Sequence, residues 1–142
     1  MGRRLIYLTA LVAFSSACGC GEVPVPVRAT FTIDAALNEP IETVTIYVLG
    51  NRRTDEVFLS CSSLMTGTIG PTDVRVLVFA LGTVDIGGGT EQLDDIPAGG
   101  ERIIYVAARG ESGAVVGNGC AEHIDIRVDD TVDVDVIVFP LP

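Results

Sequence analysis

Apolar and polar residues alternate with a period of two through much of the chain after residue 24. In the first such segment Val25, Val27, Ala29, Phe31 and Ile33 fall on one face, and Pro26, Arg28, Thr30 and Thr32 fall on the other. Because successive side chains of a strand point to opposite faces of its sheet, this pattern predicts a half-buried β-strand. Pro24 and Pro26 have no backbone N–H to donate, so we expect the start of this strand at a sheet edge or in a tether.

The same kind of pattern predicts further strands along the chain. They cover residues 43–49, 102–108, 114–116, 124–128 and 132–138, with a short extended piece at 93–96. Residues 74–81 are apolar at nearly every position, which predicts a central strand covered on both faces. Turn residues separate these segments at spacings of roughly 8–12 residues, and no long amphipathic helix interrupts them. The expected fold is all-β, an antiparallel β-sandwich of seven to eight short strands that follows a cleaved N-terminal signal helix.

Residues 51–72 carry a less regular pattern with two interpretations. Residues 54–56 can cap a short helix that ends at Gly67, whereas residues 57–59 are equally compatible with a strand. We expect a helical or irregular excursion from the sheet, and it carries Cys61.

Acidic residues crowd the last two predicted strands, at Asp125, Asp129, Asp130, Asp133 and Asp135. A three-residue loop over 129–131 keeps the apolar residues of both strands on one face, and it places Arg127 opposite Asp133. It also places Asp125 opposite Asp135, and facing like charges are destabilising. Because calcium takes oxygen ligands, Asp125 and Asp135 are the candidate calcium ligands. The favoured interpretation is nevertheless a solvated strand face, since the spacing matches no EF-hand loop and alternating aspartates on a strand usually face solvent.

Charge and length narrow the possible classes of protein. The chain has 142 residues, 9 basic residues and 19 acidic residues, and its formal net charge is −10. That length suits one domain. A nucleic-acid partner is not expected, because a phosphate backbone needs a positive surface. Regularly spaced hydrophobic residues, 48% of the chain, argue against intrinsic disorder.

Candidate catalytic motifs are few. His123 is the single histidine, and it needs help from Glu122 or Asp125 to hold a metal, so an exposed loop histidine is the favoured interpretation. Residues 110–113 lack the Gly-x-Ser-x-Gly spacing of a nucleophile elbow. Residues 87–89 are glycines without the Gly-Lys-Ser/Thr of a phosphate-binding loop. We therefore expect a protein that is not an enzyme, with no catalytic residue, no metal and no cofactor.

The N-terminus has the three parts of a secretory signal. Arg3 and Arg4 precede an apolar run over residues 5–14, and small residues follow at 15–17. The run is about half of the ~20 residues that span a bilayer. Residues 1–17 are therefore expected to be removed on export.

Ser15, Ser16, Ala17 and Cys18 together resemble the lipobox of bacterial lipoproteins, in which the cysteine is acylated and becomes the mature N-terminus. Ser16 and Ala17 match the small residues before that cysteine, whereas Ser15 departs from the usual Leu. The resemblance covers the first 18 to 20 residues and implies lipidation at Cys18, with Cys20 as the alternative acceptor. It also implies a membrane partner through a covalent lipid anchor in the bacterial cell envelope, with the outer membrane favoured. The competing interpretation is a plain signal peptide whose cysteines form disulfides.

Loss of the signal peptide changes the expected electrostatics and the cysteine chemistry. Removing Arg3 and Arg4 takes the net charge from −10 to −12. A chain with this charge is repelled by anionic lipid surfaces. Membrane attachment would therefore depend on the acyl chains, and stable anchoring needs more than one of them. Cys61 and Cys120 are then the cysteines within the domain. Export to an oxidising compartment predicts a disulfide between them.

The Ile-Pro-Ala-Gly turn at residues 96–99, followed by a strand and a cysteine-led final hairpin, resembles transthyretin-like or carboxypeptidase-regulatory-like modules. The resemblance covers about the last fifty residues and implies a non-catalytic β-sandwich. The expected organisation is a lipoprotein signal peptide at 1–17, an acylated tether at 18–26 and a β-sandwich domain at 27–142.

The domain is expected to be a non-enzymatic interaction or structural module that binds an envelope protein or a glycan. The alternative is a carbohydrate- or calcium-dependent adhesion domain. Stacking on sugars needs aromatic faces, and the chain has no Trp and only three Tyr, which argues against this alternative.

Overall fold

The computed structural model describes residues 24–34, 36–37, 39–85, 90–128 and 131–141. The predicted signal peptide and the candidate lipidation sites Cys18 and Cys20 lie outside the described residues. Within the described ranges, no helix is long and apolar enough to cross a membrane.

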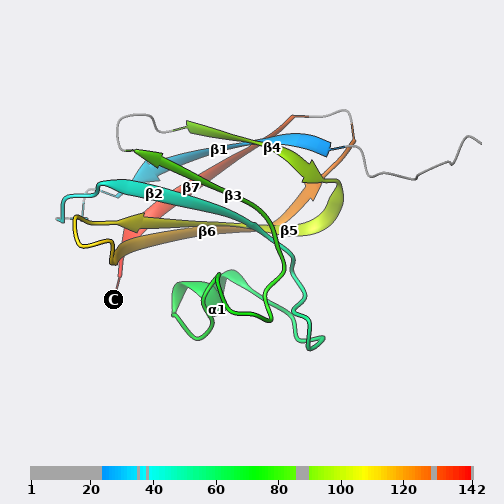
Figure 1. Cartoon of the computed structure of the whole chain (residues 1–142), viewed down its shortest axis with the longest axis horizontal. Coiled ribbons are helices and arrows are strands. Elements are labelled where there is room, and N and C mark those ends of the chain that lie inside the picture. Colours follow the sequence, from blue (N-terminus) through cyan, green and yellow to red (C-terminus); the bar gives the residue numbers. More distant parts are fainter. Residues whose placement is uncertain (1–23, 35, 38, 86–89, 129–130, 142) are drawn as a thin grey trace, which may run out of the picture.

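The described residues form strands and one short helix (Figure 1). In chain order the elements are β1 (Pro24–Ile33), β2 (Thr43–Leu49), α1 (Cys61–Met65), β3 (Val78–Asp85), β4 (Thr90–Pro97), β5 (Gly99–Arg109), β6 (Val115–Ile126) and β7 (Val132–Pro140). The strands belong to one seven-stranded sheet with the order β3-β2-β5-β6-β7-β1-β4. The expected all-β class is confirmed.

The sheet is mixed, which corrects the expectation of a strictly antiparallel fold. β1 runs parallel to β7, from Val27 beside Val132 to Ile33 beside Val138, whereas the other neighbouring strands are antiparallel. Alternation within one strand shows which face is buried, but it carries no information about the direction of the neighbouring strand. The direction of β7 beside β1 is therefore a property of the tertiary fold.

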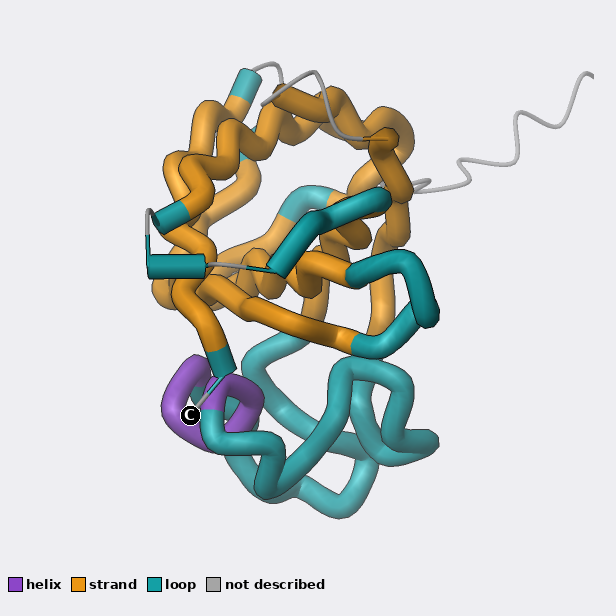
Figure 2. Tube along the Cα trace, turned by 90° about the vertical axis from the view of Figure 1, so that its left-hand side faces the viewer, coloured by secondary structure: helices purple, strands orange, loops and turns teal. Residues whose placement is uncertain are grey.

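The sheet is sandwich-like because its two halves face each other across one core. One half is β3-β2-β5-β6 and the other is β7-β1-β4, and the ladder between β6 and β7 pairs Gly117 with Pro140 and Asn118 with Phe139. The two edge strands, β3 and β4, also approach each other, so the strands form an almost complete ring (Figure 2). The core between the halves is built from buried apolar residues of six strands: Val27, Ala29, Phe31, Val44, Ile46, Val48, Leu93, Ile96, Ile104, Val106, Ala108, Ile126, Val134, Val136 and Val138.

A second apolar cluster covers the outer face of β2 and β5. It joins Tyr47, Leu49, Ile103, Tyr105 and Ala107 of the strands to Leu59, Leu64, Ile69 and Val76 of the segment that connects β2 to β3. This connecting segment, residues 50–77, includes α1 and lies below the strands in Figure 1. β2 and β5 are thus buried on both faces, although the alternation of residues 43–49 predicted burial of one.

The expectation of a central strand over residues 74–81 is wrong. The strand begins only at Val78, and β3 is an edge strand that pairs with β2. Val74 is 94% exposed and Leu81 is 58% exposed. The first residues of the apolar run belong to the end of the connecting segment, where Val76 packs in the second cluster. The continuous run of apolar residues therefore does not indicate a strand covered on both faces.

The connecting segment contains a helix, but not where residues 54–56 placed its start. α1 begins after Ser60, whose hydroxyl accepts a hydrogen bond from Ser63 N at 3.3 Å as an N-cap. It ends two residues before Gly67, which has a φ of 71°. Residues 57–59 form no regular strand, since their pairing is an isolated bridge between Arg52 and Phe58.

Candidate functional site

A cleft of about 350 Å³ lies between the connecting segment and the sheet. Leu64, Met65, Thr66, Gly67, Ile69, Gly70 and Pro71 line it from the connecting segment, and Tyr105, Val115, Asn118 and Leu141 line it from the sheet side. Its walls are mainly apolar. A volume in the range of about 300–1,000 Å³ with apolar walls and a few polar groups is typical of small-molecule sites.

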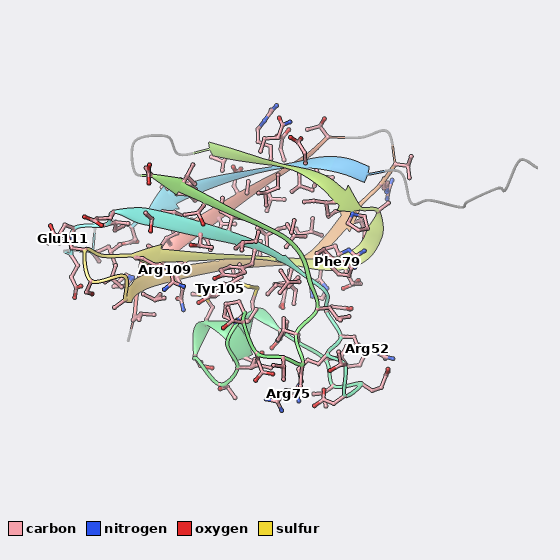
Figure 3. All side chains as sticks on the ribbon, in the orientation of Figure 1. Arg52, Arg75, Phe79, Tyr105, Arg109 and Glu111 are labelled. Atoms are coloured by element: carbon pink, nitrogen blue, oxygen red, sulfur yellow. A yellow bond between two sulfur atoms is a disulfide. The ribbon has the colours of Figure 1, made fainter. Side chains whose placement is uncertain are left out.

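Two polar side chains of the sheet face this cleft. Asn118 of β6 is 4% exposed and Tyr105 of β5 is 5% exposed. The amide Nδ2 of Asn118 donates to the Tyr105 hydroxyl and to the carbonyl oxygen of Met65, each at 3.3 Å. Figure 3 shows Tyr105 on the side of the sheet that α1 covers.

The hydroxyl of Tyr105 is a hydrogen-bond donor at neutral pH. Burial raises its pKa above the usual value, while the hydrogen bond from Asn118 acts in the opposite direction. The floor of the cleft therefore combines a neutral O–H group with a side-chain amide.

A disulfide holds one wall of the cleft to the sheet. Cys61, the first residue of α1, is bonded to Cys120 of β6, with their Cα atoms 5.5 Å apart. The predicted pairing is thus confirmed, and the separation lies within the range usual for disulfides. Glu122 adds a second link, because its Oε2 accepts a hydrogen bond from the Cys61 N–H at 2.8 Å.

The chemistry of the cleft favours binding. Among the described residues that line it, Tyr105 alone has a titratable side chain. General acid–base catalysis needs a group whose pKa lies near the working pH. Apolar walls with one hydroxyl and one amide can instead position a ligand.

His123 lies in β6, where the β5–β6 ladder is irregular, rather than in the loop that the sequence suggested. It and Glu101 of β5 both have positive φ angles, 63° and 57°. Their side chains meet at the surface, with His123 Nδ1 2.6 Å from Glu101 Oε2. The expectation of exposure holds, because both side chains are more than half exposed.

Replacing Glu101 by glutamine should lower the pKa of His123. The hydrogen bond to the Glu101 carboxylate raises that pKa above the ordinary value of about 6.5, and the charge of the same carboxylate adds to the effect. Because the folded pKa is the higher one, the stability that this pair adds is complete below about pH 6.5 and is lost as pH rises through the folded pKa. An NMR titration of the His123 ring measures the shift.

The matched control for that titration is Glu122→Gln. Oε1 of Glu122 lies 3.9 Å from His123 Nε2, and the charge of Glu122 is the smallest of the influences that raise the pKa of His123. We expect a smaller change than for Glu101→Gln. Equal titration curves for wild type and Glu101→Gln would contradict the assigned cause.

The predicted register of the last hairpin is wrong. Asp133 does not face Arg127 across a β6–β7 ladder, but lies beside Arg28 of β1, with 3.3 Å between Arg28 Nη1 and Asp133 Oδ1. Over most of its length β7 pairs with β1, and the β6–β7 ladder lies at Gly117 and Asn118. β7 lies between β6 and β1 in the sheet, and its ladder with β6 is confined to its last residues, whereas its ladder with β1 begins at Val132.

The two candidate calcium ligands are consequently not opposite each other. Asp125 accepts a hydrogen bond from the backbone N–H of Glu101 at 3.2 Å, whereas Asp135 is paired in register with Thr30 of β1. Within the described part of the chain, no group of three or more His, Cys, Asp or Glu side chains is placed to hold a metal ion. The repulsion that motivated the calcium hypothesis is relieved by strand placement.

Comparison with protein-family models finds no match for this chain, and comparison with curated proteins finds none either.

Sequence reasoning did not single out Tyr105 or Asn118. The alternation placed Ile104 and Val106 inward, and both are fully buried, but it gave no role to Tyr105 on the opposite face of that strand. The one local signal was Asn118 itself, a polar residue between two glycines in an extended segment. A polar side chain at such a position can be recognised as part of a site only when the structure shows that the connecting segment covers it.

Proposed function

We propose that this chain is an exported, lipid-anchored protein of the bacterial cell envelope whose domain is a non-enzymatic interaction module. The observation that carries export is the disulfide between Cys61 and Cys120, because disulfides persist in oxidising compartments and are rare in the cytosol. The signal-like segment before Cys18 supports the same compartment and supplies the acylation site.

The cleft supports the choice of an interaction module over an enzyme. Its walls are apolar, its floor offers hydrogen bonds from Tyr105 and Asn118, and its lining has no acid–base pair among the described residues. The partner of such a module would be an envelope protein or a glycan.

We further infer that the domain is a β-sandwich of the transthyretin-like or carboxypeptidase-regulatory-like kind. Two features support this relationship: the halves of the sheet face each other over one core, and the turn at residues 96–99 leads from β4 in one half to β5 in the other. Modules of this kind are generally non-catalytic appendages, which agrees with the proposed role.

Replacing Cys18 by serine should release the protein from membranes in a bacterial host. The thiol of Cys18 is the proposed acyl acceptor, and a chain with this negative charge gains little from anionic lipid headgroups. Membrane fractionation and intact-mass measurement check the result. The wild type should lack residues 1–17 and carry the added mass of the acyl chains.

Cys20→Ser is the matched control, and it should stay in the membrane fraction. If Cys18→Ser is retained and the double variant Cys18→Ser/Cys20→Ser is released, Cys20 takes over as the acceptor when Cys18 is absent. A wild-type chain that is soluble and without acyl mass would refute the lipid anchor and leave a plain exported domain.

A further inference from the structure

We propose that the cleft between α1 and strands β5 and β6 is a binding site for a neutral, mainly apolar small molecule that carries a carbonyl-type oxygen. The site is separate from the lipid anchor, so it stands whether or not Cys18 is acylated. Four observations carry it: the size of the cleft, its buried polar groups, its charge and its disulfide-held wall.

The size and lining of the cleft set the scale and polarity of the ligand. About 350 Å³ accommodates a compact molecule at the small end of ligand sites. Leu64 and Ile69 are buried in the wall, while Leu141 at the opposite rim is 42% exposed. An apolar ligand would cover apolar surface that now meets water, which is favourable in proportion to the area covered.

The polar groups on the floor have open hydrogen-bonding capacity. The Tyr105 hydroxyl accepts from Asn118, and its own proton is donated to no residue in the described chain. Asn118 uses its Nδ2 twice, while its Oδ1 accepts from none of the described residues. Both residues are more than nine-tenths buried, but Asn118 Oδ1 is not among the fully enclosed atoms without a partner, so it is open to a group in the cleft.

A ligand oxygen can complete this arrangement. The Tyr105 hydroxyl, whose ordinary pKa of about 10 is raised by burial, is protonated at neutral pH and can donate to a carbonyl oxygen in the cleft. The Asn118 Oδ1 can accept from a ligand N–H or O–H when the ligand has one. A ketone, ester or amide on an apolar body therefore matches the floor and the walls together.

The absence of charged side chains in the lining of the cleft disfavours an ionised ligand. None of the lining residues is charged, and the chain as a whole has a net charge of −10. Arg109, the cation that acts on the Tyr105 hydroxyl, has the smallest of the four influences on it, and its guanidinium donates to the carbonyl oxygen of Gly113 at 2.9 Å. An anion or a cation in the cleft would lose its hydration without gaining an ion pair, because the lining has no charged side chain.

The wall of the cleft is held in place before any ligand arrives. Cys61 is linked to Cys120 on the sheet, and Leu64 and Ile69 pack in the second apolar cluster. A site that is already formed loses less entropy on binding than one that must be ordered.

The test uses the full chain with Cys18→Ser and Cys20→Ser, so that neither detergent nor acyl chains compete for an apolar probe. The probe is prodan, a neutral naphthalene ketone whose emission shifts to the blue when it leaves water. We expect saturable binding with one site per chain. Its analogue 2-(dimethylamino)-6-propylnaphthalene has a methylene in place of the carbonyl and should bind more weakly.

Two substitutions locate the site. Gly70 lines the cleft, and a Cβ there meets nothing within 4 Å, so Gly70→Phe adds a large side chain at the wall of the cleft without a clash and should weaken prodan binding at least tenfold. Thr83→Phe, on the exposed side of β3, adds the same side chain elsewhere and should leave binding unchanged. Denaturant unfolding of both variants verifies that they are folded.

Tyr105→Phe tests the hydrogen bond and decides the matter if Gly70→Phe does not fold. Loss of one neutral hydrogen bond should weaken prodan binding about fivefold to tenfold, while the affinity for the propyl analogue, which has no carbonyl, stays the same. A purely structural role for the hydroxyl would weaken both probes equally and overturn the proposal. Absence of saturable prodan binding, or unchanged binding by folded Gly70→Phe, would overturn it as well.

Discussion

Replacing Cys61 and Cys120 together by serine is expected to lower the free energy of unfolding by about 4 kcal/mol. The two cysteines are 59 positions apart, so the disulfide removes much of the loop-closure entropy of the unfolded chain. It also ties α1 to β6, the only disulfide link between the connecting segment and the sheet in the described structure. Denaturant unfolding of wild type and variant under identical conditions measures the difference.

The loss should be accompanied by a local change that the global measurement does not see. Hydrogen-exchange protection should fall first around α1, because its helix is five residues long and depends on packing and on the covalent link. Ser62→Ala, at the exposed position next to Cys61, is the matched control and should change stability by less than about 0.5 kcal/mol. Equal stability of the double variant and the wild type would show that packing of Leu64 and its neighbours holds the segment without the disulfide.

Gly119→Ala should destabilise the domain by about 3 kcal/mol, the upper part of the usual range for overpacking. A Cβ at this position would lie 2.7 Å from Val136 Cγ1 and closer still to the carbonyl oxygen of Ile137. Both neighbours belong to β7, next to the short β6–β7 ladder that joins the two halves of the sheet. The backbone of β7 cannot move away without breaking that ladder.

Gly70→Ala serves as the control for this prediction. A Cβ on Gly70 meets no atom within 4 Å, so the substitution should stay within about 0.5 kcal/mol of wild type. Denaturant midpoints of the two variants give the comparison. If both variants match the wild type, the approach of β6 to β7 is looser than these contacts require, and the two halves are held mainly by their common core.

The alternation of apolar residues predicted most of the strands and the inward face of several of them, although the segments 114–116 and 124–128, expected as separate strands, fall largely within the single strand β6. Val134, Val136 and Val138 are buried as their period-two spacing predicts, and so are Ile104 and Val106. This information is local, because side-chain direction in a strand depends only on sequence parity. The disulfide was predictable for a different reason, since the signal segment removed the other cysteines from consideration.

What the alternation could not predict was the outer face of β2 and β5. Thr45 and Tyr47 occupy the polar side of their strand, yet they are only 6% and 5% exposed. The connecting segment covers this face, and its contacts join residues far apart in the chain. The same coverage creates the cleft and gives Tyr105 and Asn118 their significance as candidate ligand contacts.

The sequence by itself thus determined the all-β class, the inward positions of the strands, the cysteine pair and the expectation of export. The tertiary structure decided the parallel pairing of β1 with β7, the edge position of β3 and the separation of Asp125 from Asp135. The physical reason is that burial pattern is encoded residue by residue, whereas neighbour identity and strand direction depend on how the whole chain closes its core. A binding cleft between a sheet and a distant connecting segment belongs to the second kind of property.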